Sequence, residues 1–350
     1  MLRFLYTLCV LIAIPLVAQT ARPAKPGDLT NFFTGNASRS ANQPVGGPAL
    51  LPMGGGAEVD AAFITHAYPI INGGDIVVLR VTGTSGYQNY FANQLVASGP
   101  LKPNSVETLV VNSRAKADTD YVAWVVSGAN MIWMAGGDQS DYTSFWRGTK
   151  LEKAIRNAYA RGAVIGGTSA GAAVLGEFIY DPGAQSAVDS AQAMANPYRA
   201  GMILTESLFD APLGFDLYFE PHFANRTRMG RTLSIMARIR QDARTSSITS
   251  VALDEATSMF INDQRVGVVQ RFSGSGSVYV LRETRLGTRR VRVQSGQSVI
   301  YRDIERIKLV PGNTYDFKTG VASVSTTNST TIAPLLLSVE QTSVVPASHY

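Results

Sequence analysis

The sequence predicts an α/β protein whose mainly parallel β-sheet is covered by helices on both faces. From residue 49 to residue 169, short apolar segments rich in β-branched residues alternate with helical segments, a pattern typical of buried parallel strands joined by crossover helices. Gly-rich turns follow three of these strands, at residues 54–56, 136–137 and 166–167. Because the carboxyl ends of parallel strands meet at one edge, we expect these turns to lie together around a candidate site.

Each strand is predicted from a run of apolar residues, and each helix from the longer amphipathic segment between two such runs. The expected strands cover residues 49–53, 75–81, 108–111, 131–135 and 163–165. The expected helices cover residues 61–71, 87–98, 118–126 and 150–161. Further strands are expected at residues 218–223 and 250–253, and a polar helical segment follows the first of them.

The residue pattern changes after residue 262, where short β-rich segments are separated by turn residues. These segments cover residues 266–269, 277–281, 289–293 and 298–301. They predict an antiparallel, β-rich appendage packed on the main sheet, followed by a mobile Ser/Thr-rich tail from residue 323 in which residues 334–337 dock. The predicted organisation is a signal peptide (1–18), an extended arm (19–48), an α/β domain (49–262) and a β-rich C-terminal region (263–350).

The N-terminus has the pattern of a secretory signal. A basic start at Arg3 precedes an apolar stretch over residues 4–17, and small residues at Ala18 and Ala21 offer cleavage points. We therefore predict export to the periplasm or the medium, with no membrane span after cleavage. A retained membrane anchor is the alternative interpretation.

Composition excludes several classes of site. With 350 residues, 45% hydrophobic and 16% charged, the chain is globular with ample core. The net charge of +5 is modest, and no Lys/Arg run with interleaved aromatic residues indicates nucleic-acid binding. The single cysteine, Cys9, lies in the signal segment, so thiolate nucleophiles, disulfides and cysteine metal sites are not expected. Without a His-x-x-x-His spacing or a Walker-type loop, no metal or other cofactor is expected.

The most informative segment is Gly-Thr-Ser-Ala-Gly at residues 167–171, between a β-branched run and a small-residue helical pattern. Strand, turn and helix in that order predict a nucleophile elbow with Ser169 at its tip. The alternative is a Gly-rich turn whose serine caps the helix. If Ser169 is a nucleophile, the Ala170 N–H and an N–H from the Gly136–Gly137 turn are the expected oxyanion donors.

An activated serine needs a base, and the chain has only three histidines, at positions 66, 222 and 349. His66 falls within a predicted helix and His349 within the tail, so His222 is the preferred base, with a satisfied surface histidine as the alternative. Asp254 and Glu255 follow the strand over residues 250–253. Either carboxylate could orient the imidazole while the other caps the turn.

Three arginines, Arg226, Arg228 and Arg231, follow His222. Guanidinium groups bind carboxylates in a bidentate manner, so this cluster favours a substrate that carries carboxylates. The alternative is a solvated helix face.

These blocks together resemble the cyanophycinases, within a serine peptidase group that also holds aspartyl dipeptidases. The resemblance rests on five blocks that span roughly residues 45–262: Met53–Glu58, Gly136–Gln139, Gly166–Ala172, His222–Arg231 and Asp254–Thr257. It implies a flavodoxin-like, doubly wound α/β fold that is often dimeric, and a triad formed here by Ser169, His222 and Glu255.

The resemblance also implies a substrate. Cyanophycin is a polyaspartate with arginine on each side-chain carboxyl, which the family cuts to β-Asp-Arg dipeptides. The positions that match the substrate groove are Asp138, Gln139, Glu220, Arg226, Arg228 and Arg231. This chain departs from the family pattern just before the histidine, where Glu220-Pro221 replaces Asp-Gln, and proline also removes a backbone donor.

Three hypotheses follow. The first is an exported serine exopeptidase that hydrolyses cyanophycin or a similar polyamide through an acyl-enzyme. The second is an aspartyl or isoaspartyl peptidase with the same chemistry, and the third is a non-catalytic binding protein on the same scaffold.

Overall fold

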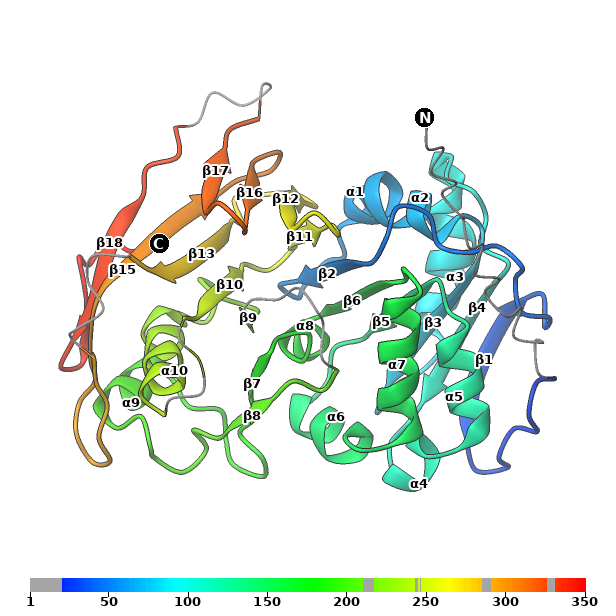
Figure 1. Cartoon of the computed structure of the whole chain (residues 1–350), viewed down its shortest axis with the longest axis horizontal. Coiled ribbons are helices and arrows are strands. Elements are labelled where there is room, and N and C mark those ends of the chain that lie inside the picture. Colours follow the sequence, from blue (N-terminus) through cyan, green and yellow to red (C-terminus); the bar gives the residue numbers. More distant parts are fainter. Residues whose placement is uncertain (1–20, 210–216, 243–244, 246, 285–290, 326–330) are drawn as a thin grey trace, which may run out of the picture.

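A computed structural model describes residues 21–209, 217–242, 245, 247–284, 291–325 and 331–350. Two β-sheets lie side by side in it, and the chain passes repeatedly between them (Figure 1). The first sheet has the order β1-β4-β3-β5-β6-β2-β11-β12-β16-β17, and the second has the order β19-β18-β15-β13-β10-β9-β7-β8 with β14 paired to β15. The predicted signal peptide, which includes Cys9, falls outside the described residues.

The predicted parallel sheet is confirmed as the centre of the first sheet. Its five strands, from one side to the other, are β4 (Ser105–Val110), β3 (Asp75–Arg80), β5 (Met131–Met134), β6 (Val164–Thr168) and β2 (Ala49–Met53). Because β2 pairs with β6, the turn at residues 54–56 lies next to the predicted nucleophile elbow.

Helices cover both faces of these strands, as predicted. One face packs against α5 (Asp120–Ser127) and α7 (Lys150–Ala160), and the other against the helical segment α1 (Asp60–Ala62), a π-helical turn (Phe63–Ala67) and α2 (Tyr68–Ile71) (Figure 1). Alternate side chains of β3 supply the two cores, because successive residues of a strand point to opposite faces. The apolar residues of α7 recur at helical spacing, which is why it lies flat on the sheet.

The remaining helices are shorter than or additional to those expected. They are α3 (Gly86–Asn89) with the turns Tyr90–Gln94 and Val96–Ser98, α4 (Arg114–Ala117), α6 (Gln139–Trp146), α8 (Ala170–Ala173), α9 (Ser190–Ala195) and α10 (Met229–Gln241). The helix after the elbow, α8, has only four residues. Among the described residues, no helix is long and apolar enough to cross a membrane.

The second sheet begins where the chain leaves the elbow. Its inner strands are β7 (Phe178–Tyr180), β8 (Leu204–Glu206), β9 (Leu217–Glu220) and β10 (Thr249–Leu253). Strand β9 pairs in parallel with both β7 and β10. Helices α9 and α10 cover one face of this sheet and form an apolar core with it.

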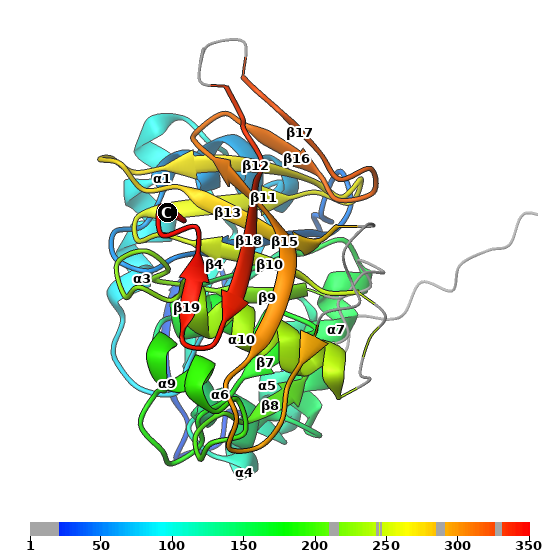
Figure 2. The ribbon, with the colours of Figure 1, turned by 90° about the vertical axis from the view of Figure 1, so that its left-hand side faces the viewer.

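The C-terminal region differs in placement from the expected appendage. Its strands are present and antiparallel, but they extend the two sheets at their edges (Figure 2). The strands β11 (Thr257–Ile261), β12 (Val266–Arg271), β16 (Thr314–Asp316) and β17 (Val321–Ser323) continue the first sheet. The strands β13 (Val278–Glu283), β14 (Val291–Arg292), β15 (Ile300–Leu309), β18 (Leu335–Glu340) and β19 (Ser343–Val345) continue the second. Residues 289–290 of one predicted strand lie outside the described residues.

The two ends of the described chain are held more firmly than the sequence suggests. The tail expected to be mobile is paired through β18 and β19, because its alternating apolar residues complete the second sheet. The arm includes a strand, β1 (Thr30–Gly35), that pairs antiparallel with β4. Arg22 of the arm forms an ion pair of 2.6 Å with the buried Glu107.

Candidate active site

Ser169 stands at the carboxyl end of β6 in a strained turn, with φ +55° and ψ −120°. This is the geometry expected of a nucleophile elbow, in which the side chain is lifted clear of the sheet. The turn depends on its glycines, because a Cβ on Gly171 would lie 2.1 Å from the Met134 carbonyl oxygen. The sequence pattern around Ser169 therefore forms the predicted strand–turn–helix.

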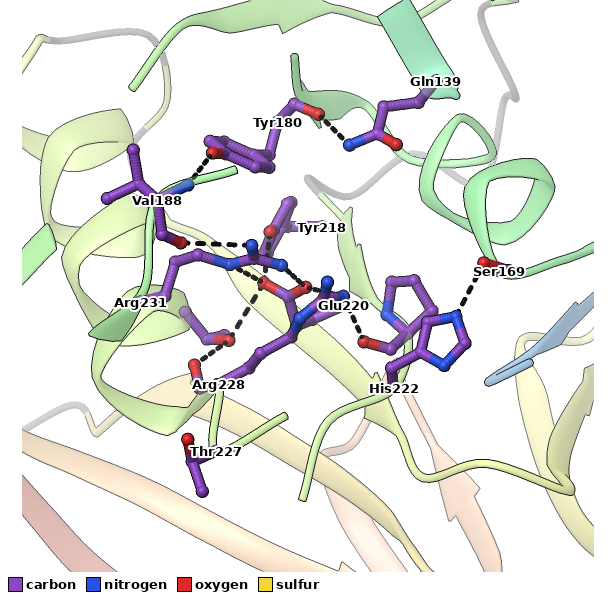
Figure 3. Close-up of polar contacts among 12 residues, drawn as sticks. Gln139, Ser169, Tyr180, Val188, Tyr218, Glu220, His222, Thr227, Arg228 and Arg231 are labelled. Atoms are coloured by element: carbon purple, nitrogen blue, oxygen red, sulfur yellow. Dashed lines mark hydrogen bonds and ion pairs between the residues drawn. The ribbon is translucent and has the colours of Figure 1, made fainter. Parts of the chain in front are cut away.

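The second sheet brings His222 to Ser169. His222 follows β9, and its Nε2 lies 2.7 Å from the Ser169 Oγ (Figure 3). Its backbone N–H donates to the Gly54 carbonyl at 2.8 Å, and Gly55 packs so closely that a Cβ there would lie 2.2 Å from the imidazole Cε1. The turn at residues 54–56 thus supports the histidine, a role that its glycines alone did not reveal.

The imidazole is nearly enclosed, and this sets its charge. Burial lowers the pKa of His222, and the nearby Arg226 and Arg228 lower it further, against the raising effect of Glu255. The net direction is below the ordinary value, so the ring is neutral at pH 7. A neutral imidazole can accept a proton from the serine hydroxyl.

Glu255, and not Asp254, faces the histidine. The Glu255 Oε1 lies 2.6 Å from the His222 Nδ1. The Asp254 carboxylate instead accepts the backbone N–H groups of Ala224 and Ser277, each at 2.9 Å. The two adjacent carboxylates therefore divide the roles of orienting and capping that the sequence left open.

Asn225 completes this arrangement and was missed in the sequence. Its side-chain oxygen accepts the Glu255 backbone N–H at 3.0 Å. Asn225 lies three residues after His222, so the same segment carries the imidazole and holds the backbone of Glu255, which faces that imidazole. In the sequence, the only sign of this role is that Asn225 is a polar residue in the loop after β9.

Ser169 and His222 open onto a pocket of about 390 Å³ that includes both predicted oxyanion donors, Gly137 and Ala170. The Ala170 amide begins α8, where helical N–H groups have no partner within the helix. Gly136 also lies close, since a Cβ on it would be 3.5 Å from the Ser169 Cβ. The predicted donors and the serine thus share one cavity.

The far side of the pocket is built around a buried carboxylate, Glu220 (Figure 3). Its Oε1 accepts from Arg231 and, at 3.1 Å, from Arg228. Its Oε2 accepts from the Tyr218 hydroxyl at 2.6 Å and from Thr232 at 3.3 Å. Both carboxylate oxygens are therefore occupied by groups of the protein itself.

The charges in this cluster hold one another in place. Burial on its own raises the pKa of Glu220, but Arg231 and Arg228 outweigh it and bring the pKa below the ordinary value. Arg231 is itself buried, and its guanidinium lies 4.7 Å from the centre of the Tyr180 ring. The sequence favoured these arginines as ligands for substrate carboxylates, with a solvated helix face as the alternative, and among Arg226, Arg228 and Arg231 only Arg226 is exposed.

The other predicted residues lie as follows. Gln139 lines the pocket, and its amide donates to the Tyr180 carbonyl at 3.3 Å. Asp138 is exposed and caps α6 by accepting the Ser140 N–H at 2.9 Å, so it is not part of the pocket wall. His66 stacks on Phe260 at 4.8 Å, away from the site. Among the described residues, no group of His, Cys, Asp and Glu is arranged to hold a metal ion.

A serine, a histidine and a glutamate in line at the carboxyl edge of a mainly parallel sheet define the class of serine-nucleophile α/β proteins. Within that class, the chain belongs to peptidase family S51, whose family model matches residues 84–269. That match spans Ser169, His222 and Glu255. The predicted resemblance to cyanophycinase-like serine peptidases is confirmed at the level of the family.

Curated relatives agree with this family. The cyanophycinase of Synechococcus elongatus is 32% identical over 178 residues, which are 50% of this chain and 49% of that protein. The cyanophycinase of Geminocystis herdmanii is 30% identical over 166 residues, covering 47% of this chain and 53% of that protein. The chain therefore spans about half the length of the curated relatives it matches.

A solved structure of a peptidase from an acI-B1 actinobacterium is a more distant likeness. It is 18% identical with a TM-score of 0.49 and covers 79% of this chain and 99% of that chain. A likeness at this level carries no argument about activity.

Proposed function

We propose that this chain is a serine peptidase that hydrolyses an amide bond through an acyl-enzyme. The observation that carries the proposal is a series of two hydrogen bonds. The Ser169 Oγ lies 2.7 Å from the His222 Nε2, and the His222 Nδ1 lies 2.6 Å from the Glu255 Oε1. The elbow geometry at Ser169 and the neutral imidazole support the same role.

The chemistry follows from these two hydrogen bonds. The Ser169 Oγ attacks the substrate carbonyl carbon while the His222 Nε2 takes the hydroxyl proton, and the carbonyl electrons move to the oxygen. The N–H groups of Ala170 and Gly137 stabilise that oxyanion, each worth about 3 kcal/mol in comparable sites. His222 then protonates the leaving amine, the C–N bond breaks, and water hydrolyses the resulting ester by the same route.

For the substrate we propose cyanophycin or a similar polyaspartate whose side-chain carboxyls carry amide-linked residues. Support comes from the S51 family and from relatives named cyanophycinase. The test is release of β-Asp-Arg from cyanophycin by the wild-type protein and by Ser169→Ala. Release that the substitution leaves unchanged would refute the proposed nucleophile, and no release by either protein would refute the substrate.

A second substrate class, aspartyl or isoaspartyl peptides, is favoured by one observation. Among the residues that the structure describes, three arginines and a single carboxylate line the pocket, and that carboxylate, Glu220, is already occupied by Arg228, Arg231 and Tyr218. A substrate carboxylate would meet an excess of positive charge, whereas a substrate guanidinium would find no available carboxylate among these described lining residues. We propose on this basis that the replacement of Asp-Gln by Glu220-Pro221 affects specificity.

A panel of short substrates separates the two classes. The same protein would be assayed on two β-Asp-Arg units joined through their aspartates, on the corresponding β-Asp-Leu compound, and on the free dipeptides α-Asp-Leu, β-Asp-Leu and β-Asp-Arg. Faster release of intact β-Asp-Arg than of β-Asp-Leu from the joined units supports the cyanophycin-type substrate, and cleavage of the free dipeptides with indifference to arginine supports the second class. Failure of a fluorophosphonate to label Ser169 would instead favour the non-catalytic protein.

We also propose export, on the basis of the basic start and apolar stretch in residues 1–18. N-terminal sequencing of the protein from the periplasmic or extracellular fraction would test it. A new N-terminus at Gln19 or Arg22 is expected, and an intact Met1 in the cytoplasmic fraction would contradict the proposal.

A further inference from the structure

The last residues of the chain pack behind the segment that carries His222. Strand β18 pairs antiparallel with β15, and β19 pairs with β18, so that both lie at the outer edge of the second sheet. Helix α10 packs against both strands. The chain then turns back, and Figures 1 and 2 both place its end beside β13.

The ring of Tyr350 fills the space between two aromatic residues. It meets Phe223 edge-on with the ring centres 5.4 Å apart, and Tyr279 of β13 at 6.3 Å. Phe223 is fully buried and directly follows His222, which is held at φ +50°. The Tyr350 ring therefore supports the peptide that carries the imidazole.

The hydroxyl of Tyr350 acts on the neighbouring helix. It accepts the backbone N–H of Met229, the first residue of α10, at 2.9 Å. The residue in the capping position is Arg228, whose side chain makes no capping hydrogen bond. Tyr350, which is distant in sequence, thus supplies the hydrogen-bond acceptor for a helix N-terminus that a serine or aspartate in the capping position usually supplies. It fixes the start of α10 next to the guanidinium that binds Glu220.

A third connection runs through Tyr279 to Glu255. In the register of β10 with β13, Tyr279 lies opposite Ala252, and β10 leads directly into Asp254 and Glu255. The Tyr350 side chain therefore contacts the segments that carry the imidazole and an arginine of the pocket, and it is connected to the Glu255 segment indirectly, through Tyr279 of β13. Residues 331–350 thus reach the site without lining its pocket.

We propose that Tyr350 is a positioning residue for His222, so that the C-terminal strands are required for a fully competent site. This inference rests on the proposed peptidase function. It gives residues 263–350, which lie mostly beyond the matched part of the family model, a role in the reaction.

The test compares Tyr350→Phe and Tyr350→Ala with the wild-type full chain. Tyr198→Phe is the matched control, because its hydroxyl donates to Asp242 at 2.5 Å at the other end of the same helix. One readout is the rate constant for fluorophosphonate labelling of Ser169. The other is the pKa of the His222 ring from an NMR titration, which the presence of only three histidines makes assignable.

Loss of the hydroxyl alone is expected to slow labelling about two- to tenfold, the effect of one backbone hydrogen bond. Loss of the ring as well is expected to slow it roughly 50-fold. In Tyr350→Ala the pKa of His222 should rise toward its ordinary value, because the loosened segment is less buried. Tyr198→Phe should leave both readouts at the wild-type level.

Equal labelling rates and an unchanged His222 pKa in Tyr350→Ala would overturn the inference. A loss in Tyr198→Phe equal to that in Tyr350→Phe would also overturn it, because the effect would then be general helix stability. A wild-type protein that the reagent does not label would instead refute the proposed function. The NMR titration would still decide the positioning role in that case.

Discussion

Replacing Glu255 by glutamine tests the proposed line of three residues most directly. The change keeps the size of the side chain but removes the charge that faces the His222 Nδ1 at 2.6 Å. A charge-assisted hydrogen bond is worth about 1.5–3 kcal/mol, or roughly 10–150-fold in rate. The amide can also donate to Nδ1, which favours the tautomer whose Nε2 is protonated and unable to accept from Ser169.

Together these effects predict a loss of about 10²–10³-fold in kcat/KM. A loss near 10⁴-fold is typical when the carboxylate is fully buried, and here 37% of the Glu255 side chain is exposed, so water replaces part of the interaction. The pH profile should change as well. Glu255 raises the pKa of His222, so the acid limb of kcat/KM, already below the ordinary imidazole range, should move to lower pH.

Asp254→Asn is the matched control for this change. Asp254 accepts two backbone N–H groups and does not face the histidine, so its variant should lose about 1–2 kcal/mol of stability while activity falls less than tenfold. The activity of both variants would be measured on whichever substrate of the panel the wild-type protein cleaves, and their free energies of unfolding would be measured in urea. A Glu255→Gln variant within tenfold of wild type, or a larger activity loss in Asp254→Asn, would refute the reasoning.

Three other changes have expected outcomes of different kinds. Gly55→Ala places a Cβ 2.2 Å from the His222 ring at φ +98°; labelling of Ser169 should fall at least about 100-fold, and a wild-type rate would be inconsistent with the packing. Glu220→Gln leaves the buried Arg231 and the partly buried Arg228 without their counter-charge and should cost about 3 kcal/mol in urea unfolding, while dipeptides with an extra carboxylate should bind more tightly. Glu58 accepts a hydrogen bond from the Tyr87 hydroxyl, and burial raises the pKa of its carboxyl to about 7. Because the folded state binds this proton more strongly than the unfolded state, the free energy of unfolding should fall by about 3 kcal/mol as the pH rises from 4.5 to 7. Glu58→Gln should abolish this pH dependence, and an unchanged dependence in the variant would contradict the assignment.

Local patterns were enough to predict the main sheet and the elbow. A β-branched run followed by Gly-x-Ser-x-Gly fixes strand and turn through neighbouring residues alone, and the scarcity of histidine left His222 as the preferred partner of Ser169. The carboxylate was different. Asp254 and Glu255 are adjacent, so only the direction of each side chain in the folded turn separates them, and the residues themselves left both open.

Interactions between distant segments explain most of what was not predicted. The arginines after His222 suit a solvated face or a substrate equally well, and the sequence does not show that Glu220 binds two of them across β9 and α10. The tail was expected to be mobile because it is rich in Ser and Thr. Its residues 335–345 are paired because β15 offers them a free edge, which is a property of the sheet and not of the tail.

The way the chain crosses between the sheets has a consequence for its synthesis. After Glu255 the chain passes to the first sheet with β11 and β12, to the second with β13 to β15, back to the first with β16 and β17, and finally to the second with β18 and β19. A nascent polypeptide that ends near residue 262 exposes bare edges at β10 and β11, the strands that flank Glu255. We expect such an intermediate to be both prone to aggregation and inert as a hydrolase. We therefore expect hydrolase activity only once β13, β15, β18 and the other later strands have paired with these edges.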